Sequence, residues 1–248
     1  MTRILNIEIQ NITKDRLLKN LQSGVLITPN IDHLVKIQKD KEFYNAYQQA
    51  EWIICDSKIL YFLSKLLANP LPEAIPGSSF FQDFYKFHQN DKDCKIFLLG
   101  AAKGVADKAR ERINQKIKRE IIIGSHSPSY GFENNLQECE EIIHLINKSG
   151  ANVLVVGVGA PKQEKWITKY RERMPNVKIF MGLGATIDFE AGTLKRAPQI
   201  WQKIGMEWLY RCIKEPKRLL KRYFIDDMKF FYYFGKQLLG CYKDPFKI

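Results

Sequence analysis

The chain alternates short apolar runs with longer segments whose apolar residues recur at the spacing of an α-helix. Segments of the helical kind include residues 103–117 and 136–150. Around them lie six apolar runs, at residues 25–28, 52–55, 95–100, 120–124, 152–157 and 178–184. Because strands joined through helices pair in parallel by crossover connections, this pattern predicts a doubly wound, largely parallel α/β sheet of the Rossmann-like type. We expect this domain to cover residues 1–197.

Length and composition agree with one sizeable domain that carries an appendage. With 248 residues, of which 45% are hydrophobic, the chain can bury a large core. Its five cysteines are far apart in the sequence and form no CxxC pair, so we expect reduced thiols. The opening residues lack the apolar segment of a secretory signal, and no run approaches the roughly 18 apolar residues of a membrane span. We therefore expect a cytoplasmic protein.

Small, polar or glycine residues follow the expected strands. Ligands of a doubly wound sheet bind beyond the carboxyl ends of its strands, so these residues are candidates for one shared pocket. They are Thr28, Pro29 and Asn30 after the first run, Asp56 and Ser57 after the second, Gly100 after the third, residues 125–127 after the fourth, residues 157–163 after the fifth and residues 182–188 after the sixth.

The segment GVGAPKQEKW, at residues 157–166, predicts a tight turn from a strand into a helix. Gly157 and Gly159 allow the turn, and Pro161 suits the first helical turn, where no amide bond is lost. The amide of Gln163 can both donate and accept, which suits a nucleobase edge or a sugar. The alternative is a plain strand-to-helix corner without a ligand, since the segment contains neither a GxGxxG nor a Walker motif.

Acidic and polar residues at two other strand ends carry similar alternatives. Asp56 could cap the helix that follows it, or it could face the pocket as an ionised general base. Thr28 and Asn30 could contact a ligand or merely form the turn before the next helix. Asp188 could be a further capping acid or a pocket residue.

No pattern indicates a metal centre or a covalent nucleophile. The four histidines show neither HxxxH nor HExxH spacing, and the chain has no DxD pair and no GxSxG. We therefore expect a metal-independent reaction without a bound cofactor. His33, beside residues 28–30, is a further candidate for the lining of the pocket.

The C-terminal segment, residues 198–248, differs from the rest of the chain in charge. Lys and Arg outnumber Asp and Glu by 39 to 27 in the whole sequence, and residues 201–248 hold eleven bases against five acids. The same stretch carries twelve aromatic residues. Such a segment suits an anionic membrane surface, a single-stranded nucleic acid, or a final helix that packs its rings on the core. We expect a helical appendage that associates with a membrane.

Six segments taken together resemble one protein family. They are TPNIDHLV (28–35), CDSKIL (55–60), GSSFF (77–81), GVGAPKQEKWI (157–167), GLGATIDFEAGTLKRAP (182–198) and GMEWLYRCIKEPKRLLKRY (205–223). Their order and spacing are similar to those of the WecG/TagA/CpsF family of bacterial glycosyltransferases. The resemblance implies transfer, with inversion, of a hexose such as N-acetylmannosamine from a UDP-sugar to a polyprenyl-diphosphate-linked saccharide. The reaction would take place on the inner face of the cell membrane, in the synthesis of a cell-surface polysaccharide.

The resemblance also assigns roles to individual residues. The catalytic aspartate of the family corresponds to Asp56, the residues that contact the sugar to Thr28 and Asn30, and the glutamine on the nucleotide side to Gln163. The basic residues that are thought to reach the diphosphates correspond to Arg211, Arg218, and Lys221 or Arg222. Arg218, Lys221 and Arg222 would share one helix face, from which they could close over the pocket.

Some positions depart from the family pattern and leave the donated sugar open. Many members have the pattern DG.G where this chain reads DSKIL, which places Ser57 and Lys58 beside the presumed base, and Ala74 stands where several have arginine. One alternative is a glucosyl- or other hexosyltransferase of exopolysaccharide assembly, and another is a non-catalytic membrane scaffold. With the resemblance, nucleic-acid binding and a dinucleotide oxidoreductase are set aside. Homo-oligomerisation remains possible.

Overall fold

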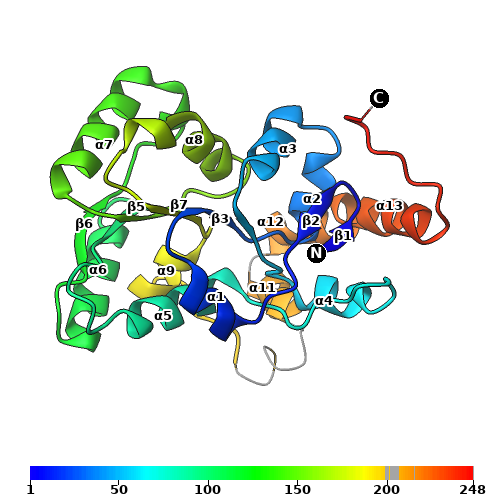
Figure 1. Cartoon of the computed structure of the whole chain (residues 1–248), viewed down its shortest axis with the longest axis horizontal. Coiled ribbons are helices and arrows are strands. Elements are labelled where there is room, and N and C mark those ends of the chain that lie inside the picture. The colour runs from blue at the N-terminus through cyan, green and yellow to red at the C-terminus, as the bar shows by residue number, and fades with distance from the viewer. Residues whose placement is uncertain (199–200, 202–206, 215, 248) are drawn as a thin grey trace.

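A six-stranded parallel sheet forms the centre of the computed structural model, which describes residues 1–198, 201, 207–214 and 216–247 (Figure 1). The strand order is β4-β3-β8-β7-β5-β6, and every neighbouring pair is parallel. The strands are β3 (Gly24–Ile27), β4 (Trp52–Ile53), β5 (Ile96–Gly100), β6 (Ile122–His126), β7 (Val153–Gly157) and β8 (Ile179–Gly182). Each of the six apolar runs forms one of these strands, so the prediction of a doubly wound parallel sheet is confirmed.

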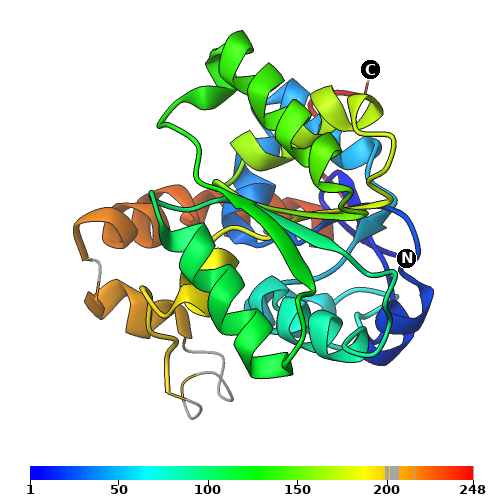
Figure 2. The ribbon, with the colours of Figure 1, turned by 90° about the vertical axis from the view of Figure 1, so that its left-hand side faces the viewer.

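Helices cover both faces of this sheet (Figure 2). One layer contains α2 (Ile31–Ile37), α3 (Lys41–Gln48), α7 (Leu136–Ser149) and α8 (Lys162–Tyr170), and the other contains α1 (Lys14–Asn20), α5 (Gly77–Phe87), α6 (Val105–Ile117) and α9 (Thr186–Ala191). Successive strand residues point to opposite layers: Leu99 and Phe180 pack with the first, Leu98 and Met181 with the second. Burial on both sides explains why these strands are continuously apolar in the sequence.

A two-stranded antiparallel hairpin, β1 (Thr2–Ile4) and β2 (Ile7–Ile9), precedes the main sheet. Helix α4 (Lys58–Ser64) follows β4, and two short 3₁₀ helices, η1 (Phe132–Asn134) and η2 (Arg171–Arg173), lie in connections. The chain passes from β3 to β4 at one edge of the sheet and from β5 to β6 at the opposite edge, so it winds in two directions from the central strands. The crevice beyond the carboxyl ends of these central strands is the expected place for a ligand.

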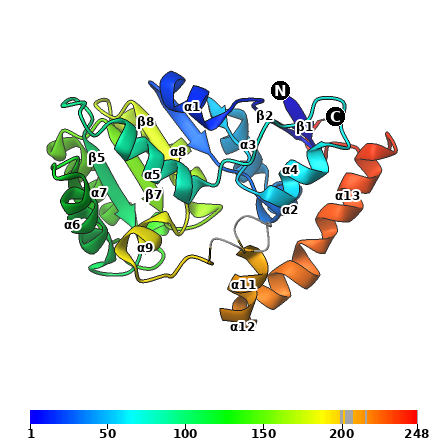
Figure 3. The same ribbon diagram turned by 90° about the horizontal axis from the view of Figure 1, so that it is seen from below.

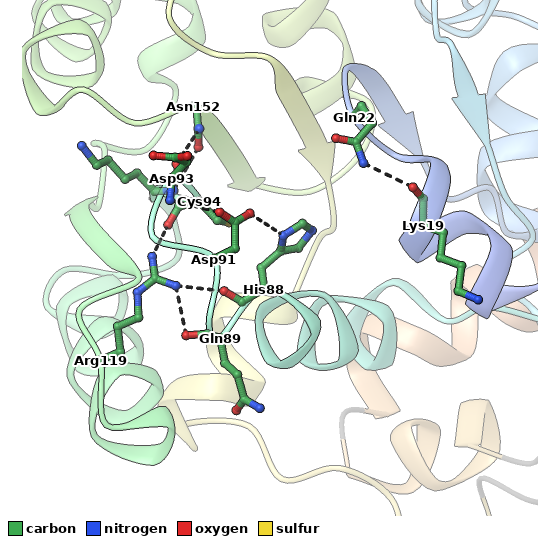
Figure 4. Close-up of polar contacts among 10 residues, drawn as sticks. Lys19, Gln22, His88, Gln89, Asp91, Asp93, Cys94, Arg119 and Asn152 are labelled. Carbon is green, nitrogen blue, oxygen red and sulfur yellow. Dashed lines mark hydrogen bonds and ion pairs between the residues drawn. The ribbon is translucent and has the colours of Figure 1, made fainter.

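Polar side chains at the amino ends of the strands serve the backbone. Arg119 donates from Nη1 to the carbonyl oxygens of His88 (2.9 Å) and Gln89 (3.1 Å), and from Nη2 to that of Cys94 (3.0 Å) (Figure 4). Asn152 accepts from the Lys95 amide at 3.0 Å. These bonds satisfy carbonyl and amide groups of the loop that leads into β5, so this cluster has a structural role.

The C-terminal segment is helical, as predicted. It contains α11 (Glu207–Lys214), α12 (Pro216–Lys221), the π-helical turn η3 (Arg222–Asp226) and α13 (Met228–Leu238). Helix α13 runs alongside α2 and reaches the β1–β2 hairpin (Figure 3). None of the helices in the described part of the chain combines the length and the apolar character that crossing a membrane requires.

Helix α13 is fixed to its own chain by buried rings and by hydrogen bonds. Phe230 and Phe234 stack with their ring centroids 5.5 Å apart and belong to the core cluster of the hairpin and α2. The side chain of Gln237 accepts from the Leu5 amide at 2.7 Å and donates to the Arg3 carbonyl at 2.9 Å. The C-terminal helix therefore packs in cis, against the N-terminal strands.

Candidate active site

A cavity of about 1720 Å³ lies beyond the carboxyl ends of the strands. Its lining combines the residues that follow β3, β4, β5, β7 and β8 with part of η3 and α13. Of the residues singled out in the sequence, the lining includes Thr28, Asn30, His33, Asp56, Gly157, Gly159, Gln163, Asp188 and Arg222. The structure thus brings these residues from five separate segments to one site.

Asp56 is held in the cavity wall by contacts with two other segments. Its amide donates to the Pro29 carbonyl at 3.2 Å, and its Oδ1 accepts from the Gly77 amide at 2.8 Å. The cap of the helix that follows is Ser57, whose Oγ accepts from the Leu60 amide at 3.4 Å. The alternative that Asp56 caps that helix is therefore wrong. Instead, the Gly77 amide in the first turn of α5 orients the Asp56 carboxylate, and Asp56 lines the cavity.

Thr28 and Asn30 follow β3 and lie next to this carboxylate. Asn30 caps α2, since its Oδ1 accepts from the His33 amide at 3.1 Å, so the turn that we considered for this segment is present. Thr28 is buried, and a Cβ added to Gly77 would lie only 3.2 Å from its Oγ1. The close approach of Gly77 brings Thr28 and Asp56 to the same point of the wall.

His33 is buried in the wall rather than exposed as a base. Its Nδ1 lies 2.7 Å from the hydroxyl of Tyr47, and burial lowers the pKa of the imidazole from 6.5 to about 3. The ring is therefore neutral at physiological pH, and it supports the wall beside Thr28 without carrying charge.

Gln163 joins the two glycine loops at the centre of the site. Its Oε1 accepts from the amides of Gly159 and Gly184, both at 3.1 Å, and its Nε2 donates to Glu164 at 2.7 Å. We expected the Gln163 side chain both to donate to a ligand and to accept from it, but its oxygen already accepts from these two backbone amides. One amide hydrogen of Nε2 remains for a ligand.

Glu164, which sequence reasoning did not select, completes this arrangement. Its side chain is fully buried, its Oε2 has no hydrogen-bond partner among the described residues, and burial raises the pKa of the carboxyl from 4.5 to about 7. A signal was present in the sequence: Glu164 precedes Ile167 by three residues and therefore lies near the buried face of α8. By accepting from Gln163, Glu164 fixes which way that amide points.

Arg222 is the basic residue of the C-terminal segment that lines the cavity. Its guanidinium lies between two carboxylates, 3.4 Å from Asp32 and 3.8 Å from Asp227. Asp227 is 4% exposed, and burial raises the pKa of its carboxyl to about 6. The Arg222 side chain, expected to face diphosphates, therefore docks η3 and α13 onto α2 in this structure.

Lys221, another basic residue of that segment, lies outside the lining of the cavity. Lys221 is exposed and lines a separate, smaller hollow with Pro216 and Leu220. Helix α12 ends at Lys221 and η3 begins at the next residue, and the common face expected for Arg218, Lys221 and Arg222 stays a prediction. Arg211 and Arg218 fall in α11 and α12, but their side chains lie outside the described residues.

Asp188 and Arg196 also line the cavity. Asp188 lies in the first turn of α9, and burial raises the pKa of its carboxyl. Arg196 belongs to the segment TLKRAP, which the sequence analysis quoted without assigning a role to this residue. Its Nη1 donates to the hydroxyl of Ser79 at 3.3 Å, and its guanidinium lies 5.4 Å from the ring centroid of Phe189.

The described residues contain no group of three or more His, Cys, Asp or Glu side chains that could hold a metal ion. The cysteines are unpaired, and four of the five are buried. The metal-independent reaction expected from the sequence stays a prediction.

Comparison with known proteins places these features in context. The model of the family described as "Glycosyl transferase WecG/TagA/CpsF family" matches residues 2–244. Two similar proteins come from Staphylococcus aureus strains MRSA252 and MW2. Both are named N-acetylglucosaminyldiphosphoundecaprenol N-acetyl-beta-D-mannosaminyltransferase. Each is 27% identical to this chain over 226 residues, which cover 87% of this chain and 85% of the relative.

Proposed function

The chain belongs to the WecG/TagA/CpsF family of glycosyltransferases, and we propose that it moves a hexose, N-acetylmannosamine or a related sugar, from a UDP-sugar to a polyprenyl-diphosphate-linked saccharide. Its relatives are named for transfer of N-acetylmannosamine to a diphosphoundecaprenol-linked N-acetylglucosamine. The observation that carries the proposal is the convergence of Asp56, Thr28 and the Gly157–Gln163 loop on one cavity of about 1720 Å³. That volume is larger than the usual few hundred to about 1,000 Å³ of a small-molecule pocket, which suits two substrates.

Asp56 acts as the general base in this proposal. Its Oδ1 is oriented by the Gly77 amide, and the carboxylate accepts the proton of the acceptor hydroxyl as that oxygen attacks the anomeric carbon. The bond from this carbon to the UDP oxygen breaks on the opposite side, so the configuration is inverted. UDP leaves with the bonding electron pair.

Negative charge on the departing diphosphate needs positive groups in the wall. Basic side chains that line the cavity are Lys36, Lys58, Lys103, Lys162, Arg196 and Arg222. The reaction is proposed to proceed without a metal ion, so EDTA should leave the rate of UDP release unchanged. A rate that falls with EDTA and recovers with a divalent cation would contradict this part.

The substitution Asp56→Asn tests the base. Asn keeps an oxygen for the Gly77 amide, so the fold is retained, but it cannot take a proton. Release of UDP in the presence of a short-chain lipid diphosphate acceptor should fall by about 10²–10⁴-fold. A rate within a few-fold of the wild type would overturn the assignment.

A screen of UDP-sugars with the wild-type protein identifies the donor. Turnover of UDP-N-acetylmannosamine supports the first choice, and turnover of UDP-glucose instead supports the glucosyltransferase alternative. If no donor is turned over, the non-catalytic scaffold is favoured.

The proposed place of action is the anionic inner surface of the cell membrane. Residues from η3 to the end of α13 leave large apolar side chains exposed: Phe224, Ile225, Met228, Phe231, Tyr232, Leu238 and Leu239. Exposed Lys221 and Lys229 accompany them. Rings and aliphatic groups insert at the level of the headgroups while lysines meet lipid phosphates, at about 1 kcal/mol per basic residue. Vesicles with anionic phospholipid should therefore retain the protein at low salt, whereas neutral vesicles should not.

A further inference from the structure

Arg196 lies at the edge of the cavity between two helices of the same layer. It follows α9 by five residues and contacts Ser79 in the first turn of α5. The hydrogen bond to the Ser79 hydroxyl uses Nη1, and the planar group lies beside the Phe189 ring. A serine hydroxyl and an aromatic ring are neutral partners, so neither balances the charge of the guanidinium.

The remaining nitrogens of this guanidinium are unpaired. Nε and Nη2 are shielded from solvent and have no hydrogen-bond partner among the described residues. A buried donor without a partner destabilises the folded protein, and more so when it is charged. Glu190, an acid in the adjoining helix, is occupied elsewhere, because it accepts from Gln82 at 2.7 Å and from Tyr85 at 3.2 Å.

Three other basic groups of the cavity differ from Arg196. Lys36 and Arg222 both form ion pairs with Asp32, and Lys162 forms one with Glu133. Their charges are balanced by the protein itself. Arg196 forms no ion pair with any carboxylate in the described part of the chain.

Arg196 is also placed next to the proposed base. The first turn of α5 provides both the Gly77 amide that binds Asp56 and the Ser79 hydroxyl that binds Arg196. An acceptor hydroxyl at Asp56 and a phosphate at Arg196 would therefore occupy neighbouring positions in the cavity. A planar guanidinium with free donors matches two oxygens of one phosphate.

We infer that Arg196 binds the diphosphate group of a substrate, with Ser79 holding the guanidinium in position. This inference rests on the proposed function, since it supplies the positive charge that a departing nucleoside diphosphate or a lipid diphosphate requires. It also gives the TLKRAP segment a chemical role that its sequence alone did not show.

Binding measurements by calorimetry test the inference with UDP and with uridine, which lacks the phosphates. Arg196→Gln should weaken UDP binding by about tenfold or more, as loss of a charge-assisted hydrogen bond of about 1.5–3 kcal/mol implies. Uridine binding should not change. Lys195→Gln is the matched control, because Lys195 is an exposed neighbour outside the lining and loses the same charge. It should change UDP binding less than twofold.

A second arm uses a short-chain lipid diphosphate that carries N-acetylglucosamine. A loss of affinity for UDP alone assigns Arg196 to the donor, and a loss for the lipid diphosphate alone assigns it to the acceptor. Arg196→Lys, which keeps a charge but not the planar fork, should recover part of the lost affinity. Thermal unfolding of each variant shows that the comparison concerns folded protein.

Three results would count against the inference. If the wild type binds UDP and Arg196→Gln binds both ligands as well as the wild type, the inference fails and the proposed function stands. If the wild type binds neither UDP nor the lipid diphosphate, both the proposed function and the inference fail. A loss of uridine binding equal to that of UDP would also count against a phosphate contact.

Discussion

Glu164→Gln should change the pH dependence of stability. Glu164 is fully buried, and its pKa is raised from 4.5 to about 7. Since the folded state holds the proton more tightly than the unfolded state, the stabilising contribution of the protonated group is complete below pH 4.5. It is lost as the pH rises through 7. At about 1.4 kcal/mol for each pKa unit, the loss amounts to about 3 kcal/mol.

Gln is the informative replacement because it has nearly the same shape and does not titrate. Its Oε1 can still accept from Gln163, so the bond that fixes the amide at the centre of the cavity is retained. The free energy of unfolding of the variant should therefore rise by about 3 kcal/mol relative to that of the wild type between pH 4.5 and pH 7.5, because only the wild type loses this stability.

Urea denaturation at several pH values between 4.5 and 7.5 provides the measurement. The comparison must be made at each pH, because other buried groups titrate in the same range. The pKa of His33 is lowered to about 3, so its contribution to stability is lost as the pH falls from 6.5, in the opposite direction. Asp227, whose pKa is raised to about 6, loses its contribution as the pH rises from 3.8. A difference between the two proteins that stays constant with pH would refute the reasoning.

Three further outcomes are expected. Gly157→Ala should lower the free energy of unfolding by about 1–3 kcal/mol and slow UDP release, because its Cβ would lie 2.6 Å from the Gly184 carbonyl oxygen. Gly104→Ala, with φ of +78° but no atom within 4 Å, should cost about 1–2 kcal/mol and less than Gly157→Ala, so an equal loss in the two variants would contradict the steric argument. Phe230→Ala should cost about 3–5 kcal/mol in urea unfolding, whereas Tyr232→Ala, at 61% exposure, should cost less than about 0.5. Vesicle binding should weaken as NaCl rises from about 0.1 to 1 M, since the Debye length falls from about 10 to 3 Å, and salt-independent binding would argue against lysine contacts with lipid.

The sheet could be predicted from the sequence because each central strand is buried on both faces. Burial on both faces requires continuous apolar runs, such as residues 152–157, which contain β7. This run ends at Gly157, which lines the cavity. The location of the site then follows from the fold, since parallel strands place their carboxyl ends together.

The contacts within the site could not be predicted in the same way, because they join distant segments. The oxygen of Gln163 is occupied by Gly184, 21 residues away, and the carboxylate of Asp56 by Gly77. Neither partner has a local signal in the sequence. The family resemblance suggested a phosphate contact for Arg222, but it gave no sign of the ion pair that Arg222 forms with Asp32 in α2.

The packing of α13 on the β1–β2 hairpin has a consequence for synthesis of the chain. Leu5 and Gln237, which bond to each other, are 232 residues apart. Gln237 leaves the ribosome long after Leu5, so the first strands wait for α13 while the central sheet can already assemble.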